Sequence, residues 1–279
     1  MSEAETVGDA PAPTAPQRTA AGRMLSLIGA FEYGGGVLTL SELSRHGGLS
    51  LTTTHRLVRE LMEWGGLEVD HRGRYRLSRK FVQLTSSTDA MHLREIALPH
   101  LMKLHRQVGG STVHLAVRDG RNIMYLDALR SYPNYTGESR IGGNLPLHAT
   151  AAGLVLLANS TEDEIREYMQ EPLQRFTPHT IVDPDELTQT LEMIRAQRHF
   201  VYPRSIVLDA GGVATPITGL GGAVRASVNV VWFIDQQDPQ TLLGYARAAT
   251  AAISRALVGG RQAPDARTVD FNRRRAGLF

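Results

Sequence analysis

The sequence predicts an α+β protein with a winged helix-turn-helix unit near the N-terminus, a linker helix, and a larger α/β unit after it. Three short amphipathic helices before a basic hairpin predict the first unit. Strands and helices mixed around a mainly antiparallel pattern predict the second. The boundaries that we expect are 18–85 for the first unit, 86–108 for the linker helix and 109–258 for the second unit.

Length and composition limit the class of protein. A chain of 279 residues with 42% apolar side chains is long enough for two domains. The absence of cysteine excludes disulfides, thiolate zinc sites and cysteine nucleophiles. No apolar run approaches the roughly 20 residues of a membrane-spanning helix, and the first residues lack the pattern of a signal peptide. We therefore expect a cytoplasmic protein without a membrane partner, with a disordered arm at 1–17 and a flexible basic tail at 259–279.

Positive charge is concentrated in the first unit. Residues 18–80 contain ten Lys and Arg against six Asp and Glu, whereas residues 81–258 contain fifteen against seventeen. A local excess of cations is expected where a protein meets phosphate, although an excess of this size also occurs on ordinary solvated surfaces. The charge pattern favours a nucleic-acid partner for the first unit.

The helices of the first unit have recognisable starts. Apolar residues at helical spacing predict a first helix from Arg23 to Phe31. Thr39 and Glu42 form a T-x-x-E capping box that begins a short second helix, and Ser50 can cap a third. The third helix is expected to bury Thr54, Leu57, Val58 and Leu61.

The outer face of this third helix and the hairpin after it suit a DNA-binding surface. A helix in the major groove needs slim side chains at its N-terminal end and donors that reach bases or phosphates. The hairpin turns at Arg72-Gly73-Arg74, which makes a basic tip. The alternative is that Thr53 only caps and the charged residues only keep the surface soluble. The residues that we expect to contact double-stranded DNA are Ser50, Thr52, Thr53, His55, Arg56, Arg59, Arg72 and Arg74.

In the second unit, an amphipathic stretch at 91–109 predicts the linking helix, which Pro99 should kink or restart. Strands are predicted at 111–117 and 122–128, and again at 211–217 and 221–234. Capping boxes at 161–164 and 183–186 predict two helices, and residues 240–257 predict a closing helix.

The segment LPLHATAAG, residues 145–153, joins a strand end to a helix whose first turn holds only small side chains. Small residues leave room for a ligand to approach the N–H groups of a helix N-terminus, which favours an anion such as a carboxylate. Close packing of this helix on a sheet requires Ala and Gly equally. Both interpretations stay open at the level of sequence.

These motifs resemble the IclR family of bacterial transcription regulators over roughly residues 18–258. The most specific matches are GLS-x-TT-x-HRL, which begins at Gly48, and LPLHATAAG. The resemblance implies a winged-helix domain, a linker helix and a C-terminal domain of GAF-like fold. It also implies a small effector in that domain, and assembly as a homodimer or a dimer of dimers.

The resemblance also indicates an effector site. Carried over position by position, it implies contacts at Leu145, Ala151, Ala152, Ser227 and Asn229. Pro203 and Val213 stand where members that respond to small keto acids often have an acidic residue and a cysteine, and Leu154 replaces a common lysine. These replacements remove polar partners. We therefore expect a small organic acid that is aromatic or bulky and apolar, such as a hydroxybenzoate, with its anion on the Ala151 and Ala152 amides and Ser227.

Other classes of function remain as alternatives. The effector domain can instead respond to a small keto acid, or serve only for oligomerisation without a ligand. A hydrolase is a remote alternative, because the chain contains no HExxH, P-loop or G-x-S-x-G motif and its histidines have no identifiable catalytic partner. We expect no enzymatic activity, no cofactor and no metal.

Overall fold

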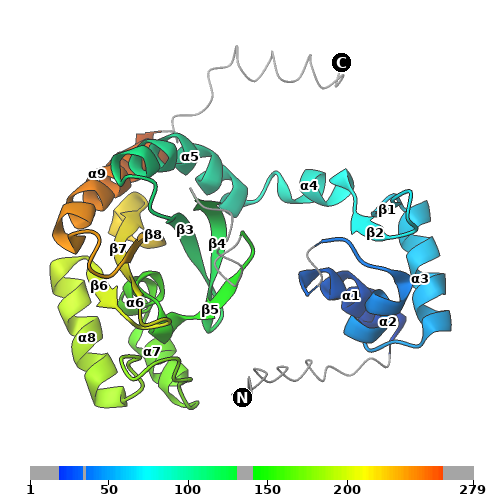
Figure 1. Cartoon of the computed structure of the whole chain (residues 1–279), viewed down its shortest axis with the longest axis horizontal. Helices are drawn as coiled ribbons and strands as arrows, with labels where there is room; N and C mark the ends of the chain where they lie inside the picture. Colours follow the sequence, from blue (N-terminus) through cyan, green and yellow to red (C-terminus); the bar gives the residue numbers. More distant parts are fainter. Residues whose placement is uncertain (1–18, 34–35, 131–140, 260–279) are drawn as a thin grey trace, which may run out of the picture. The chain divides into compact units, whose positions relative to one another are not determined.

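The computed structural model describes residues 19–33, 36–130 and 141–259 (Figure 1). The chain divides into two compact units between Thr88 and Asp89. The expected arm at 1–17 and, apart from Gly259, the expected tail lie outside the described residues.

The first unit is a helix-turn-helix with a two-stranded wing, as the sequence predicts. The strands pair antiparallel, with Leu67 opposite Leu77. Leu38 exchanges backbone hydrogen bonds with Tyr75, which joins the wing to the helical core. The elements of this unit are, in order, α1 (Ala20–Gly29), η1 (Ala30–Glu32), α2 (Leu40–His46), α3 (Leu51–Glu63), β1 (Leu67–Val69), β2 (Tyr75–Leu77) and α4 (Arg79–Thr85).

Caps and an apolar core fix the two helices of the motif. Thr39 and Glu42 form the predicted capping box, with each side chain bonded to the backbone N–H of the other residue. The Ser50 hydroxyl accepts the N–H of Thr53 at the start of α3. The inward face of α3 is buried as predicted. The core consists of Leu27, Ala30, Phe31, Leu38, Leu43, Leu57, Val58, Leu61 and Leu67.

Helix α4 follows the wing and was not predicted as a separate helix. Its own residues are not buried, and it is attached to the end of α3 by contacts with Trp64. The Phe81 ring packs edge-on against the Trp64 ring, and Lys80 Nζ lies 4.1 Å from the Trp64 ring centroid. These contacts place α4 with the first unit, within the boundary expected at residue 85.

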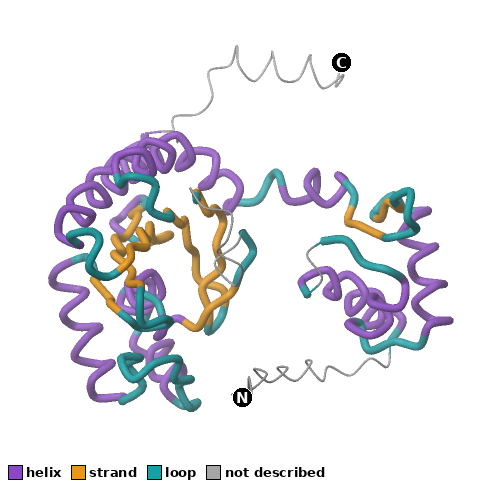
Figure 2. Tube along the Cα trace, in the orientation of Figure 1, coloured by secondary structure: helices purple, strands orange, loops and turns teal. Residues whose placement is uncertain are grey.

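The second unit is a six-stranded antiparallel sheet with helices on both faces (Figures 1 and 2). The strand order is β5-β4-β3-β8-β7-β6, so strands far apart in the sequence meet at the centre. Its elements are α5 (Asp89–Gln107), β3 (Val113–Asp119), β4 (Asn122–Leu129), β5 (Asn144–Pro146), η2 (Leu147–Ala149), α6 (Ala151–Ala158), α7 (Glu162–Met169), α8 (Pro184–Gln197), β6 (Phe200–Pro203), β7 (Ala210–Thr218), η3 (Leu220–Gly222), β8 (Val224–Phe233) and α9 (Pro239–Gly259). The predicted α+β class is confirmed.

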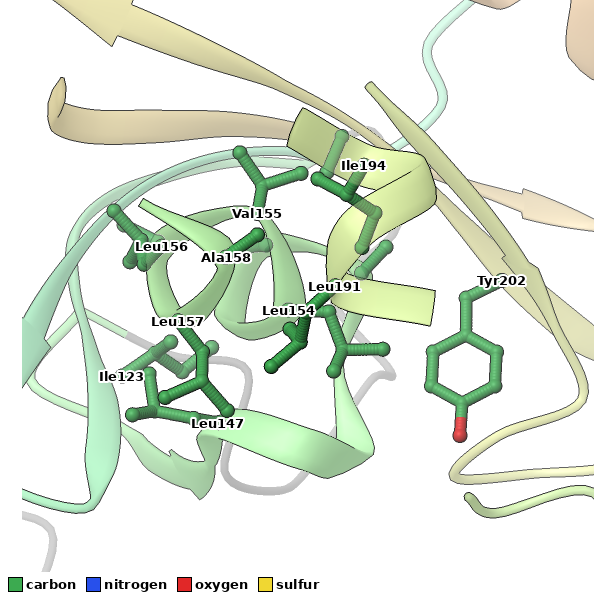
Figure 3. Packing of buried hydrophobic residues seen from close by; sticks show 14 of the residues in the cluster. Ile123, Leu147, Leu154, Val155, Leu156, Leu157, Ala158, Leu191, Ile194 and Tyr202 are labelled. Carbon is green, nitrogen blue, oxygen red and sulfur yellow. The ribbon is translucent and has the colours of Figure 1, made fainter. Parts of the chain in front are cut away.

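Two apolar clusters cover the two faces of this sheet. Helix α6 is buried along its whole length and packs against α8 and β6, as the side chains of Leu154, Leu191 and Tyr202 show (Figure 3). On the other face, α5 and α9 lie side by side and bury Leu101, Leu104 and other side chains against β3, β7 and β8. Burial on both faces explains why the strands carry apolar residues at consecutive positions.

Three local expectations are corrected. The α5 helix continues through Pro99 and does not restart there, and the buried neighbours Ala97 and Leu101 pack both halves in one apolar cluster. At α8, Asp183 caps the helix by accepting two backbone N–H groups, but the described residues show no return bond from Glu186. Pro203 was expected in a loop or pocket and instead ends the edge strand β6, a position that tolerates a missing N–H.

Gly153 explains part of the small-residue pattern at the start of α6. A Cβ at this position would lie 2.2 Å from the backbone oxygen of Leu147, so the helix can approach η2 only with glycine there. Close packing, which the sequence left as an alternative, is therefore one reason for the small residues. It does not account for Ala151, which lines a cavity described below.

Gly153→Ala should lower the free energy of unfolding by about 1–3 kcal/mol, because the new methyl group collides with backbone atoms that cannot turn away. Gly244→Ala is the matched control. Gly244 lies in α9 with no atom near its Cβ direction, so the same change should raise stability by about 0.5–1 kcal/mol. Urea unfolding of both variants checks this, and equal stability of Gly153→Ala and the wild type would contradict the packing argument.

Candidate nucleic-acid interface and effector site

The outward face of α3 is open to solvent. Thr52, His55, Arg56 and Arg59 are exposed, and Thr53 is half-buried because it contacts the Ser50 cap. The first turn of α3 carries no acidic residue. A helix N-terminus with small hydroxyl side chains and no negative charge can approach a phosphate backbone closely.

Both arginines of this face have an acidic neighbour one turn later. Arg56 Nη1 lies 2.7 Å from Glu60 Oε1, and Arg59 Nη2 lies 3.9 Å from Glu63 Oε1. Exposed i,i+4 pairs contribute only about 0.3–0.5 kcal/mol. The pairs therefore orient the arginines without preventing their transfer to a phosphate or a base.

The wing is shaped by one carboxylate, Asp70. Its Oδ1 accepts the backbone N–H groups of Arg72 and Arg74 at 2.8 and 3.0 Å, and its Oδ2 lies 2.8 Å from Arg74 Nη2. These hydrogen bonds to the backbone of Arg74, followed by that of Arg72, lower the pKa of Asp70 from 3.8 to about 2. Arg74 therefore stabilises the turn, whereas the exposed Arg72 guanidinium has no ion pair among the described residues.

The second unit contains a partly open cavity of about 100 Å³ between the sheet and the start of α6. Most of its lining is apolar, and the polar groups come from strands β3, β4 and β8, from the N-cap of α6 and from Ser205 between β6 and β7. The lining residues are His114, Tyr125, Leu145, Thr150, Ala151, Ser205, Ile206, Val207, Ala210, Gly211, Gly212, Asn229 and Val231. A cavity of this size is comparable with the apolar cavities of about 150 Å³ that accept a single aromatic ring.

Three side chains form the polar floor of this cavity. His114 on β3 pairs in register with Asn229 on β8, and its ring stacks on Tyr125 with centroids 4.2 Å apart. Asn229 is only 5% exposed, and its Oδ1 has no hydrogen-bond partner within the described part of the chain. A buried carbonyl oxygen without a donor is unfavourable by about 1–3 kcal/mol, which a ligand with a suitable O–H or N–H group would recover.

The N-terminus of α6 closes the cavity on one side. The Thr150 hydroxyl accepts the N–H of Gly153 at 2.9 Å. The N–H groups of Ala151 and Ala152, which begin the helix, have no partner among the described residues. A Cβ on Gly212 would lie 2.7 Å from Asn229 Oδ1 and 3.1 Å from Ala151 Cβ. Gly212 therefore keeps open the space between the helix and the amide.

The effector residues expected from sequence are only partly brought together. Leu145, Ala151 and Asn229 line the cavity, while Ala152 is buried behind it in the cluster around α6. Ser227 is fully buried, and its hydroxyl donates to the Thr215 carbonyl at 3.2 Å, so it does not line the cavity.

Pro203 and Val213 also lie elsewhere, which corrects the expectation for both. Pro203 is exposed at the sheet edge, and Val213 packs against the α5 and α9 face. Side chains alternate along β7, so Gly212 rather than Val213 faces the cavity. The argument for an apolar site from these two replacements therefore fails, although the lining is mainly apolar for other reasons.

Sequence reasoning missed His114 and Tyr125 as cavity residues. The alternation of Val113, Leu115 and Val117 predicts a strand with one apolar face, and it gives no indication that the other face is covered. The sheet is covered on both faces, so His114 is buried as well, at 1% exposure. The signal in the sequence was His114 itself, a histidine between the apolar residues Val113 and Leu115 of a predicted strand.

An exposed helix-turn-helix with a wing, joined to a domain that contains a ligand-sized cavity, defines a DNA-binding transcriptional regulator with an effector domain. The chain matches the models of two domains, the IclR helix-turn-helix domain over residues 20–71 and the bacterial transcriptional regulator IclR C-terminal domain over residues 85–255. The chain therefore belongs to the IclR family.

Individual proteins agree with this assignment. The chain is 29% identical over 244 residues to the transcriptional regulator XynR of Escherichia coli. The aligned region covers 84% of this chain and 95% of that protein. It resembles an IclR homolog from Microbacterium hydrocarbonoxydans complexed with 4-hydroxybenzoate, with a TM-score of 0.80, 28% identity, and coverage of 86% and 99%. The Thermotoga maritima IclR is similar at a TM-score of 0.65, 27% identity, and coverage of 84% and 99%.

These relatives are named as regulators, so the expectation of a regulator rather than an enzyme is confirmed. Within the described ranges, no helix has the length and apolar character needed to cross a membrane. In the same ranges, no group of three His, Asp or Glu side chains is placed to hold a metal ion.

The Asp70 carboxyl should titrate with a pKa of about 2 in the folded protein. Because folding lowers this pKa, the carboxylate stabilises the folded wing fully above pH 3.8, and the contribution is lost as the pH falls through about 2. A pH titration followed by carbon-13 NMR of the carboxyl groups measures this pKa, and the Asp70→Asn variant identifies the Asp70 signal. A pKa near 3.8 would show that the wing is not organised by this residue.

Proposed function

We propose that this regulator binds double-stranded DNA as a homodimer or dimer of dimers, and that a small aromatic carboxylate in the cavity changes its affinity for DNA. In each protomer α3 enters the major groove and the wing contacts the phosphate backbone, so two-fold symmetry matches a near-palindromic site. We also propose that the second unit has a GAF-like fold.

The observation that carries the choice of effector is the buried Asn229 Oδ1 beside the stacked His114 and Tyr125 rings. An aromatic ring suits the apolar lining and the neighbouring rings. A phenolic hydroxyl on that ring supplies the donor that Oδ1 lacks, and the carboxylate accepts from the free N–H group of Ala151. The relative with 4-hydroxybenzoate supports the same class of ligand.

The same geometry ranks the alternatives. A small keto acid provides acceptors only, so it leaves the Asn229 oxygen without a donor. A domain that only oligomerises has no use for a cavity with a buried amide at its floor. An aromatic acid with a hydroxyl group is therefore the best fit to the described residues.

The contacts to DNA divide into different roles. Thr52, Thr53, His55, Arg56 and Arg59 are placed on the open face of α3 to reach bases and phosphates. Ser50 caps the helix, and Arg74 holds the wing, so these two residues act mainly by position. Arg72 is the wing cation that is free to meet a phosphate.

Arg72→Gln should weaken binding to any duplex and reduce the slope of log affinity against log salt by about 0.9, since one phosphate contact is lost. Arg76→Gln is the matched control. Arg76 lies in strand β2 rather than at the turn, and its Nε and Nη2 both donate to Glu68 Oε2, at 2.9 and 2.7 Å. Its removal should therefore change the slope less than the removal of Arg72. Fluorescence anisotropy on a generic duplex at several salt concentrations measures both. Equal slopes for Arg72→Gln and the wild type would remove Arg72 from the interface.

The effector proposal is tested by comparing 4-hydroxybenzoate, benzoate and pyruvate in thermal-shift titrations of the full chain. We expect 4-hydroxybenzoate to bind about tenfold to a hundredfold more tightly than benzoate, because only its hydroxyl reaches Asn229. Asn229→Leu keeps the size of the side chain and removes the unpaired oxygen. It should leave the ligand-free melting temperature equal or higher and abolish the difference between the two aromatic acids.

Two outcomes would contradict this assignment. Pyruvate binding as tightly as 4-hydroxybenzoate would favour the keto-acid alternative. An absence of any shift, together with intact DNA binding, would favour the oligomerisation domain without a ligand.

A further inference from the structure

We propose that the second unit carries another ligand site, for a small oxyanion, on the opposite face of the sheet from the effector cavity. It is a cavity of about 230 Å³ between α9, β7 and the end of α8. Its lining contains two arginines and four hydroxyl side chains but no carboxylate. The lining residues are Arg198, Thr215, Pro216, Thr218, Arg247, Thr250, Ala251 and Ser254.

The two guanidinium groups are not neutralised. Arg198 ends α8 in the left-handed conformation, with φ of +55°, and its backbone N–H bonds to Ile194. Its side chain has no hydrogen bond or ion pair within the described residues. In the part of the chain that the structure describes, the polar contacts of Arg247 Nη2 are with the Gln197 carbonyl at 3.4 Å and His199 Nδ1 at 3.0 Å, and neither acceptor is charged negatively. Two cations that line one cavity attract an anion between them.

A buried hydroxyl points to the same conclusion independently. Thr215 is 1% exposed, and its Oγ1 has no hydrogen-bond partner in the described part of the chain. It lies on β7 at an odd position, like Val213 and Ile217, so it faces α9 and not the effector cavity. A hydroxyl buried in this way is unfavourable unless a ligand or water accepts its hydrogen.

Two further hydroxyls of the lining, those of Ser254 and Thr250, differ in whether they can donate to a ligand. Ser254 Oγ accepts the N–H of Thr218 at 3.0 Å, which leaves its hydrogen free to donate. Thr250 already donates to the carbonyl of Ala246 at 3.1 Å. The site therefore offers donors from Arg198, Arg247, Thr215 and Ser254, a set that suits the oxygen atoms of a phosphate or a small carboxylate.

The site differs in chemistry from the effector cavity. It has no aromatic side chain in its lining and two positive charges, whereas the effector cavity is mainly apolar. A compact, strongly hydrated anion therefore fits here and an aromatic ring does not. Because the two cavities lie on opposite faces of β7, the two ligands can bind together.

Inorganic phosphate and malonate are the probes, titrated separately into the full chain at constant ionic strength with thermal shift as the readout. We expect a saturable rise in melting temperature with at least one of them. Arg198→Gln and Arg247→Gln should each weaken it about tenfold or more. A larger effect of phosphate than of malonate would identify the source as a phosphate, and the reverse a carboxylate.

Arg255→Gln is the matched control, since Arg255 is exposed on the same helix, removes the same charge and does not line the cavity. It should keep the full response. Thr215→Val guards against unfolding as an explanation. Removing an unpaired hydroxyl should leave the ligand-free melting temperature equal or higher, while the response to the anion weakens.

Two results would overturn the proposal. The first is the same response in the wild type, Arg247→Gln and Arg255→Gln, which would mean general screening of charge. The second is the absence of a saturable response to either anion, which would mean that water alone satisfies the Thr215 hydroxyl. Asn229→Leu should retain the response, so failure here is separate from failure of the effector proposal.

Discussion

The alternation of side chains along β7 and β8 is the constraint on which the second unit depends. Helices cover both faces of the sheet, so each residue of these strands faces either α6 or the α5 and α9 pair. Gly212 and Asn229 form the effector cavity on one face, and Thr215 lines the cationic cavity on the other. A shift of one residue in register would exchange the two sets and destroy both sites.

One irregularity in the sheet connects its two faces. Leu115 pairs with Asp127 and Ala116 with Tyr125, so Leu126 is an extra residue in β4. This bulge lets Tyr125 face the effector cavity while Asp127, two residues later, faces α5 and lies 3.0 Å from Arg94 Nε. Asp127 is 3% exposed, and the charge of Arg94 offsets its burial, but its Oδ2 forms no hydrogen bond of good geometry within the described residues. Through this ion pair, the strand that carries Tyr125 is tied to α5, the helix that begins the second unit at Asp89.

Much of the fold could be predicted from sequence because it is encoded locally. The capping boxes at Thr39 and Thr161, the buried face of α3 and the hairpin at Arg72 each depend on residues within one or two turns. The effector site depends instead on which strands become neighbours, and β3 pairs with β8 across more than a hundred residues. That pairing brings His114 to Asn229, and no local pattern could indicate it. The ion pair between Arg74 and Asp70 could not be predicted from the sequence either, although it separates the arginine that holds the wing from Arg72, which has no ion pair among the described residues.

In the proposed function, the effector cavity and the DNA-binding unit are coupled. The direct test measures the affinity for a duplex, selected by this protein from a random-sequence pool, with and without saturating 4-hydroxybenzoate. Coupling predicts a change of about 5–150-fold in the dissociation constant for the duplex, and an equal change in the affinity for 4-hydroxybenzoate when the duplex is bound. Binding of 4-hydroxybenzoate at Asn229 with no change in affinity for the duplex would contradict the claim.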